Sequence, residues 1–355
     1  MTLVSTLSRH YAAQCVKSNN RQEFILPRVS SPTISTAIHL APELDPTLES
    51  IRGAASRIRP WVHRTPLLAS RSLSERLGVE VRLKCENLQR AGSFKIRGAM
   101  NSLLQLDEEQ RSRGVVAFSS GNHAQGVALS ARLLGIPATI VMPENSVQSK
   151  VEATRAYGAT VVQAGVTSAT RDTVAREVAE KSGASVIPPF DDERIIAGAG
   201  TVGLEIAEEW PDVTTIVVPL GGGGLLSGIS LAATSIDPDI DVYGVEPAAG
   251  NDGERSFRTG SIVTIDPPQT IADGARTLAV GARNFPIIRE RVRDIVSVDD
   301  DVLLDTLRWA MYRTKLVIEP TGALGLAALV SGKIRPRGPV AVVLSGGNLD
   351  FSLLA

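Results

Sequence analysis

One lysine in this sequence has neighbours that favour a nucleophilic amine. Lys95 lies in the stretch Gly92-Ser93-Phe94-Lys95-Ile96-Arg97-Gly98, just after a short strand-like run. Apolar or cationic surroundings lower the pKa of a lysine, and its neutral amine can then form a Schiff base with an aldehyde cofactor. Phe94 could lie against a flat ring, and Arg97 is near enough in sequence to help keep Lys95 neutral. The stretch predicts a reactive lysine; taken alone, it also fits a surface lysine at a helix start.

A second stretch has the composition of an anion-binding turn. The apolar run Val115–Phe118 is followed by Ser119-Ser120-Gly121-Asn122-His123 and then by a helical pattern that ends at Leu134. Free backbone N–H groups and the helix dipole at such a helix start attract a negative ligand, such as a carboxylate. Asn122 and His123 could instead simply cap the helix. The motif by itself does not decide between these two functions.

A third stretch has four consecutive glycines between a strand and a helix. Gly221 to Gly224 follow the buried strand pattern 214–220 and precede the helix pattern 225–235. Bare backbone at this position lets successive N–H groups surround a phosphate. The glycines match neither a nucleotide P-loop nor the dinucleotide fingerprint, so a small phosphorylated cofactor is favoured. A tight turn required only by packing is the alternative.

Two further polar stretches follow strand patterns nearer the C-terminus. Glu246 and Asp252 lie six residues apart on a predicted loop, with Gly250 between them, and their oxygens suit a hard cation. The last strand, 340–344, is followed by Ser345, whose hydroxyl could face a heteroaromatic nitrogen. The cation signal is weak when taken alone, because polar loops of this kind are common.

The elements that must position these residues alternate along the chain. Strands are predicted at 79–85, 115–118, 138–142, 160–163, 184–188, 214–220, 241–245, 295–298 and 340–344. Helices are predicted at 45–58, 96–106, 147–157, 167–181, 201–210, 225–235 and 299–315, with others ending at 134 and 330. Repeated strand–helix units predict an α/β fold with a parallel sheet flanked by helices. Such sheets bind ligands beyond the carboxyl ends of their strands, where the polar stretches lie.

Composition excludes several classes of protein. The 355 residues are 43% hydrophobic, enough for a large core and two domains. Because 37 Lys and Arg balance 38 Asp and Glu, no charge excess favours nucleic acid or an anionic membrane. Two cysteines exclude a disulfide scaffold and indicate a reducing compartment, and no apolar run is as long as a membrane span. Residues 1–45 are mildly basic and irregular, which fits a disordered tail or an organelle-targeting segment.

Six motifs, in order, resemble a known family. S-F-K-I-R-G-A, S-S-G-N-H-A-Q-G, G-G-G-G, G-V-E-P, E-P-T-G-A and L-S-G-G-N together look like the pyridoxal-phosphate enzymes of the threonine dehydratase and serine racemase group. The resemblance extends from about residue 48 to the end. It implies the two-domain tryptophan-synthase-β-like fold (fold type II), with a large domain at 46–111 and 191–355 and a small domain at 112–190. It also implies a cytoplasmic homodimer that acts on a small amino acid.

The resemblance assigns residues to the cofactor. Lys95 would form the Schiff base and later remove the α-proton of the substrate. Asn122 would bind the ring 3-hydroxyl, and Ser345 would face the pyridine nitrogen. The implied cofactor contacts are Phe94, Lys95, Asn122, Gly221, Gly222, Gly223, Gly224, Leu225 and Ser345.

It also assigns residues to the substrate and to a cation. The substrate carboxylate would be received by Ser120, Gly121, Asn122 and His123. Arg171 loosely matches a substrate-side arginine of the serine racemase branch, although its simplest interpretation is a solvated helix position. Glu246, the Gly250 carbonyl and Asp252 match the divalent-cation site of that branch, for Mg²⁺, Mn²⁺ or Ca²⁺.

Three residues narrow the reaction within the family. Ile96 follows the lysine where cysteine and threonine synthases usually have Asp, which disfavours β-replacement. Ser345 is neutral, so it makes the ring a weaker electron sink and favours prompt loss of a β-hydroxyl. Ser120 stands where many threonine dehydratases have Ala, and its hydroxyl could protonate the opposite face of the α-carbon. With the cation pair, this points to the serine racemase and 3-hydroxyaspartate dehydratase branch.

The sequence thus predicts an ammonia-lyase, or dehydratase, of L-serine, L-threonine or 3-hydroxyaspartate that forms a 2-oxo acid and ammonia. A serine racemase is the nearest alternative, and an inactive metabolite-binding relative is a further one. Retention of Lys95, the glycines and Ser345 argues against an inactive relative. No residue in the sequence can be assigned to a second substrate carboxylate, so the substrate among the three stays open.

Overall fold

The strands form two separate sheets in the computed structural model, which describes residues 46–167 and 169–354. The larger sheet has the strand order β1 (Leu67–Ala69), β2 (Val81–Lys84), β10 (Val340–Val343), β7 (Thr215–Pro219), β8 (Asp241–Pro247) and β9 (Asp294–Val298). All neighbours are parallel except β1, which pairs antiparallel with β2. The predictions for residues 1–45 lie outside the described residues.

The smaller sheet is entirely parallel. Its order is β5 (Thr160–Val162), β4 (Ala138–Val141), β3 (Val115–Phe118) and β6 (Ser185–Val186). All four strands lie within 112–190, and the strands of the larger sheet all lie outside that range. The described residues nevertheless pack as one compact unit, so the exact boundaries of the two predicted domains stay a prediction.

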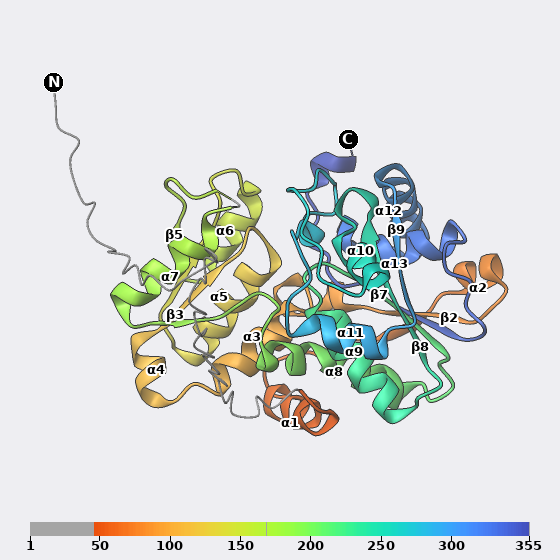
Figure 1. The fold of residues 1–355 in the computed structure, drawn as a ribbon, viewed down its shortest axis with the longest axis horizontal. Helices are drawn as coiled ribbons and strands as arrows, with labels where there is room; N and C mark the ends of the chain where they lie inside the picture. Colours follow the sequence, from red (N-terminus) through yellow and green to blue (C-terminus); the bar gives the residue numbers. More distant parts are fainter. Residues whose placement is uncertain (1–45, 168, 355) are drawn as a thin grey trace, which may run out of the picture. The chain divides into compact units, whose positions relative to one another are not determined.

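Helices connect the strands and cover both sheets (Figure 1). They are α1 (Leu48–Ile58), α2 (Arg71–Leu77), α3 (Lys95–Leu104), α4 (Glu108–Arg113), α5 (Asn122–Leu134), α6 (Gln148–Ala156), α7 (Arg171–Ser182), α8 (Glu193–Glu209), α9 (Gly224–Ile236), α10 (Asp252–Thr259), α11 (Asn284–Arg291), α12 (Asp300–Thr314) and α13 (Pro320–Val330). The prediction of an α/β fold with parallel-rich sheets flanked by helices is confirmed. No helix in the described part of the chain could cross a membrane.

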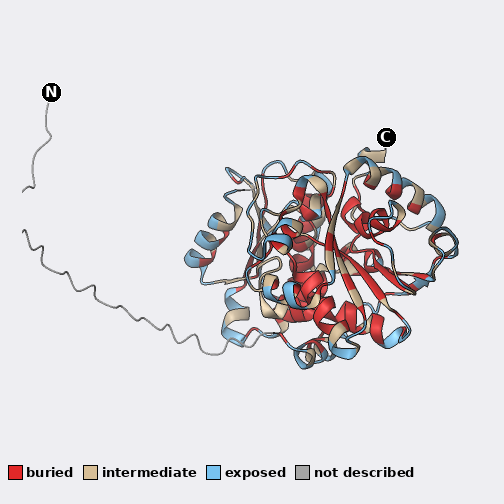
Figure 2. Ribbon diagram, turned by 45° about the vertical axis from the view of Figure 1, so that its right-hand side comes forward, coloured by how far each residue is buried: buried red, intermediate tan, exposed pale blue. Residues whose placement is uncertain are grey.

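Alternate side chains of the central strands enter different cores. In β7, Val217 packs in a core that includes α12 and α13, whereas Ile216 and Val218 pack in one that includes α8 and α9. In β3, Val115 packs on the α5 side and Val116 on the α7 side. Each such side chain contributes about 1.5–3 kcal/mol by its burial. Figure 2 shows these strands and the adjoining helices as largely buried.

The topology explains why distant motifs meet. β2, β10, β7 and β8 are parallel neighbours, so their carboxyl ends lie at one edge of the sheet. β2 leads to Lys95, β7 to the glycines, β10 to Ser345 and β8 to Glu246. The strand order therefore brings four stretches that are far apart in sequence to the same edge.

Several predicted boundaries were wrong. Helix α8 begins at Glu193, eight residues before the predicted start, because Gly198 acts as a packing residue and not as a helix breaker. A Cβ at Gly198 would lie only 2.6 Å from the carbonyl oxygen of Arg97 on α3. Glu246 belongs to β8, and Asp252 begins α10, so neither lies on the predicted loop. The short helices α2, α4, α10 and α11 were not predicted.

Candidate active site

Lys95 begins helix α3, beside the loop that follows β10. The backbone N–H of Phe94 donates to the carbonyl of Ser345 (3.1 Å), which joins the two loops directly. The Lys95 amine donates a 2.7 Å hydrogen bond to the carbonyl of Pro189 and lies 5.1 Å from the centroid of the Phe94 ring. Burial lowers the pKa of Lys95 to about 8, while the nearby Glu319 carboxylate opposes this shift. The predicted reactive amine thus has the required environment.

Arg97 does not have the role that its sequence position suggested. Its guanidinium is fully buried and bonds Glu86 at 2.8 Å and Glu205 at 2.7 Å. Two carboxylates at hydrogen-bonding distance satisfy its charge, and Arg97 does not contribute to the lowered pKa of Lys95. The prediction that Arg97 keeps Lys95 neutral was wrong, because the side chain points into a buried ion network.

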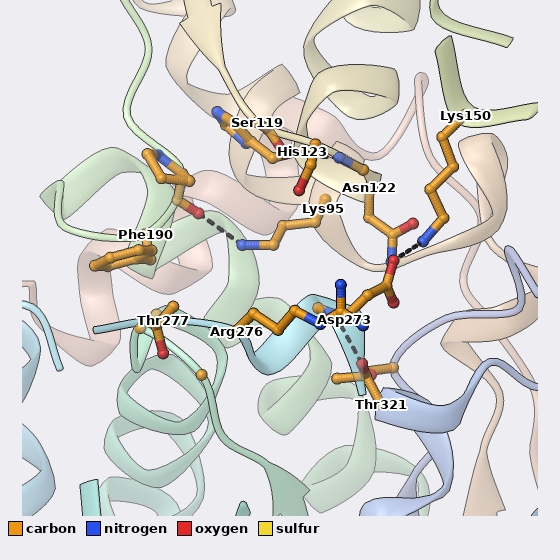
Figure 3. A pocket seen from close by; sticks show the side chains of 18 of the residues that line it. Lys95, Ser119, Asn122, His123, Lys150, Phe190, Asp273, Arg276, Thr277 and Thr321 are labelled. Atoms are coloured by element: carbon orange, nitrogen blue, oxygen red, sulfur yellow. Dashed lines mark hydrogen bonds and ion pairs between the residues drawn. The ribbon is translucent and has the colours of Figure 1, made fainter. Parts of the chain in front are cut away.

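The other predicted cofactor and substrate residues gather around Lys95. Twelve of them line the same pocket: Phe94, Ser120, Gly121, Asn122, His123, Arg171, Gly221, Gly222, Gly223, Gly224, Leu225 and Ser345. Figure 3 shows the pocket with Lys95, His123 and Asn122 beside one another. The structure therefore brings these residues together, although the contacts assigned to each with a ligand stay predictions.

The glycines form a turn that leaves the pocket open at the start of α9. Gly223 precedes the helix with φ at +100°, in the left-handed region that glycine tolerates best. A Cβ at Gly222 would lie 2.3 Å from the ring of Phe190, so a larger residue cannot fit without displacement. The helix start and bare backbone provide N–H donors and a positive dipole end for a phosphate.

His123 is positioned by a contact that occupies one of its two ring nitrogens. It is the second residue of α5, and its Nε2 lies 3.0 Å from the carbonyl of Ile187. Burial, together with the nearby Lys95 amine, lowers the pKa of His123 to about 3. The ring is therefore neutral near pH 7, and only the backbone N–H of His123 is available to a carboxylate.

Asn122 joins a group of residues to which the sequence assigned no function. Its Nδ2 donates to Glu319, and its Oδ1 accepts from Asn348. Glu319 is almost completely buried, and burial raises its pKa to about 7, while Lys150 lowers it. Glu319 and Asn348 lie in two of the six family motifs, E-P-T-G-A and L-S-G-G-N, so the resemblance could have marked them as functional residues. No sequence pattern indicated that they contact Asn122.

Charged residues from distant elements complete the pocket. Lys150 on α6 forms an ion pair with Asp273 and lies 3.9 Å from Glu319 (Figure 3). Arg276 lines the same pocket, and its guanidinium donates to the carbonyl of Thr270. Lys150 and Asp273 are 123 positions apart, so no local pattern could have paired them.

The predicted cation ligands Glu246 and Asp252 are close and fully buried. The two oxygens of Glu246 accept the backbone N–H groups of Gly253 (3.1 Å) and Glu254 (2.8 Å). Neither carboxylate oxygen of Asp252 has a hydrogen-bond partner. Burial and the proximity of Asp252 raise the pKa of Glu246, and burial raises the pKa of Asp252 to about 7. Within the described residues, no group of three or more His, Cys, Asp or Glu side chains could hold a metal.

Comparisons with known proteins agree with this geometry. The family model described as "Pyridoxal-phosphate dependent enzyme" matches residues 58–346. An L-threo-3-hydroxyaspartate ammonia-lyase from Pseudomonas sp is 53% identical over 85% of this chain and 95% of the relative. A serine racemase from Schizosaccharomyces pombe is 47% identical over 87% of this chain and 96% of the relative. The structure of maize serine racemase matches with a TM-score of 0.85 and 42% identity, covering 87% of this chain and 96% of that one.

The fold and pocket define an α/β enzyme that combines a buried lysine with a phosphate-type turn. The chain belongs to the family of pyridoxal-phosphate-dependent enzymes. The predicted resemblance to the threonine dehydratase and serine racemase group is confirmed. The pocket fits the cofactor, because Lys95 offers an amine, Gly221–Gly224 offer bare N–H groups, and Ser345 offers a hydroxyl within one cavity.

Proposed function

We propose that this enzyme converts a small β-hydroxy amino acid to a 2-oxo acid and ammonia, and that 3-hydroxyaspartate is its preferred substrate. The pocket supports a lyase because an amine with lowered pKa lies among N–H groups suited to a carboxylate and a phosphate. Relatives named L-threo-3-hydroxyaspartate ammonia-lyase support the same choice. L-Serine and L-threonine stay as candidate substrates for the same chemistry.

Arg171 is the residue that favours 3-hydroxyaspartate over L-serine and L-threonine in this proposal. It is the first residue of α7 and lines the pocket with Lys95. Its neighbour Asp172 pairs with Arg176, and no carboxylate of residues 46–167 or 169–354 forms an ion pair with Arg171. Burial lowers the pKa of Arg171, and the nearby Asp172 carboxylate opposes this shift. A substrate with a second carboxylate would supply the missing anion, and 3-hydroxyaspartate is such a substrate.

Different residues of this chain would bind the cofactor, orient the substrate and transfer the proton. When bound, pyridoxal phosphate supplies a conjugated ring that withdraws electrons from the α-carbon. Lys95 would hold the cofactor and then take the α-proton on Nζ. The N–H groups of the loop at Gly121 and Asn122 would orient the substrate carboxylate, and the turn at Gly221–Gly224 would hold the phosphate. The neutral Ser345 would leave the ring a weak electron sink, which favours loss of the β-hydroxyl.

Release of 2-oxo acid from L-serine, D-serine, L-threonine and the 3-hydroxyaspartate isomers tests the proposal. We expect the highest kcat/KM with one 3-hydroxyaspartate isomer. Arg171→Met should raise its KM by about 10–100-fold, since a hydrogen bond between charged groups contributes about 1.5–3 kcal/mol. It should change KM for L-serine little. Arg176→Met, one turn further along α7 and paired with Asp172, is the matched control. Equal losses with both substrates would contradict the role of Arg171.

Serine racemase activity is a second candidate function, and Ser120 favours it. Its hydroxyl lines the pocket that contains Lys95, so two proton-transfer groups are present. Ser120→Ala should suppress interconversion of D- and L-serine more than dehydration. An equal loss of the two activities would remove Ser120 as a second base.

We also propose a divalent cation at Glu246, the Gly250 carbonyl and Asp252. The buried Asp252 carboxylate without a hydrogen-bond partner supports this proposal, because a cation would supply the missing interaction. Chelator should lower the Tm of the wild-type enzyme, and Mg²⁺ or Ca²⁺ should restore it. Asp252→Asn should abolish the response. A wild-type Tm that does not change with chelator would argue against the site.

The homodimer and the cytoplasmic location stay predictions. Light scattering would test whether the protein is a homodimer.

A further inference from the structure

The orientation of the Asn122 amide is fixed by a chain of three side chains. Asn348 donates from Nδ2 to the carbonyl of Ala91 and to Oδ1 of Asn122, both at 2.9 Å. On the other side, Nδ2 of Asn122 donates to Oε1 of Glu319. A backbone carbonyl can only accept, so Ala91 determines which end of the Asn348 amide faces it. The same Nδ2 then requires an oxygen from Asn122, and this leaves the Asn122 amino group toward Glu319.

The backbone around this chain of contacts makes room for it. A Cβ at Gly92 would lie 2.3 Å from Oδ1 of Asn348, and a Cβ at Gly346 would lie 2.3 Å from Oε1 of Glu319. Ala91 has a φ of 58°, a left-handed conformation that is costly for a residue with a Cβ. Two glycines and one strained residue thus surround the same amide contacts: Ala91 and Gly92 just before Lys95, and Gly346 just after Ser345.

We propose that Asn348 is a positioning residue that keeps Asn122 as a hydrogen-bond donor toward the cofactor. An amide nitrogen carries two hydrogens, and Glu319 accepts only one from Asn122. Asn122 lines the pocket, so its second N–H is available to an oxygen of a bound ring. The inference rests on the proposed seat of the cofactor, with Asn122 beside the ring hydroxyl.

Asn348 matters because Glu319 alone cannot fix the amide at every pH. Lys150, Asp273 and Lys95 surround the Glu319 carboxyl, whose pKa burial raises to about 7. Above pH 7 the carboxylate only accepts and so holds the Asn122 amino group. Below pH 7 it is protonated and could donate to Oδ1 of a flipped Asn122 amide. The contact from Asn348 opposes that flip at both pH values.

The test compares cofactor loss from holoenzyme variants, followed by visible absorption after dilution. Asn348→Ala should lose pyridoxal phosphate roughly tenfold faster than wild type at pH 6, about the effect of one hydrogen bond. At pH 8.5 it should stay within about twofold of wild type. The matched control is Asn87→Ala, because Asn87 also donates to a backbone carbonyl, Val317 (3.0 Å), beside Gly347, without a hydrogen bond to Asn122. The ratio of its rate of cofactor loss to that of wild type should not change with pH.

A double variant separates positioning from a general effect on folding. If Asn348 acts through Asn122, then Asn122→Ala/Asn348→Ala should lose cofactor no faster than Asn122→Ala alone. The proposal would be overturned if the effects of the two substitutions on the rate of cofactor loss multiply. It would also be overturned if the ratio of this rate between Asn348→Ala and wild type is equal at both pH values. If Asn348→Ala does not fold, Asn348→Ser, which can donate only one hydrogen, replaces it with the same expectations. Absence of a visible band in wild type with pyridoxal phosphate would instead refute the proposed seat.

Discussion

At the scale of single residues, the reactivity of Lys95 depends on two opposing effects. Burial disfavours the charged amine and lowers its pKa to about 8, whereas the carboxylate of Glu319 favours the charge. Burial dominates, so about a tenth of the amine is neutral at pH 7 and half at pH 8. An ordinary lysine would have well under a thousandth neutral at pH 7. This difference is measurable when the cofactor-free protein captures pyridoxal phosphate.

We predict that the rate of this capture rises about tenfold from pH 7 to pH 9 and then levels off, because the neutral amine is the nucleophile. Stopped-flow absorbance would measure the rate. A surface-like lysine would instead give about a hundredfold rise without levelling below pH 9. Lys95→Ala, which lacks the amine, supplies the background rate, and a hundredfold rise in wild type would contradict the lowered pKa.

At the scale of elements, the turn between β7 and α9 combines a special backbone conformation with close packing. Gly223 has a φ of +100°, and a Cβ there would lie 2.8 Å from Cβ of Asn284. Gly135, at the end of α5, also has a positive φ of 68°, but a Cβ there would meet nothing within 4 Å. Substitutions at these two glycines therefore distinguish the effect of backbone strain, which both would cause, from the effect of crowding, which only Gly223 would cause.

We predict that Gly223→Ala and Gly135→Ala both lower the Tm, since each forces alanine into a left-handed conformation at a cost of about 1–2 kcal/mol. Only Gly223→Ala should also weaken pyridoxal phosphate binding, by about tenfold or more, because its Cβ must displace the turn. Thermal unfolding and cofactor titration would measure the two effects. Equal cofactor affinity in the two variants would count against a phosphate site at this turn.

At the scale of the whole molecule, a buried ion network joins segments that are distant in sequence. Arg97 on α3 bonds Glu86 after β2 and Glu205 on α8, and Lys84 bonds Glu205 at 2.6 Å. Burial lowers the pKa of Arg97, but Glu86 and Glu205 together raise it above its ordinary value, so the guanidinium keeps its charge. The network supports the helix that begins with Lys95, although it does not contribute to the lowered pKa of that residue.

We predict that Arg97→Met lowers the free energy of unfolding by about 3–5 kcal/mol, because it leaves the fully buried carboxylate of Glu86 without its paired cation. Chemical denaturation would measure the change. The control is Arg71→Ala, which breaks an exposed pair with Glu75 and should cost less than about 1 kcal/mol. A similar small loss in both variants would show that the network does not stabilise the fold.

Sequence patterns were enough to predict the fold class and most of the pocket residues. Asn122 follows β3 of the smaller sheet, so its approach to Lys95 depends on how the two sheets pack in the fold. Lys95, Gly221–Gly224 and Ser345 each follow a strand of the larger sheet, whose parallel strands place their carboxyl ends at a common edge. Local composition was therefore enough to predict that these residues would meet. It also gave the alternation of strands and helices, with errors where glycines such as Gly198 serve packing and not helix termination.

The partners and charge states of these residues, in contrast, depend on the folded structure. Asn348 contacts Asn122 across 226 positions, and Lys150 contacts Asp273 across 123. The partners of Arg97 and the contact of His123 with Ile187 were likewise invisible in sequence. A hydrogen bond or a pKa shift depends on the groups within a few ångströms and on their burial, and the chain brings those groups together only when it folds.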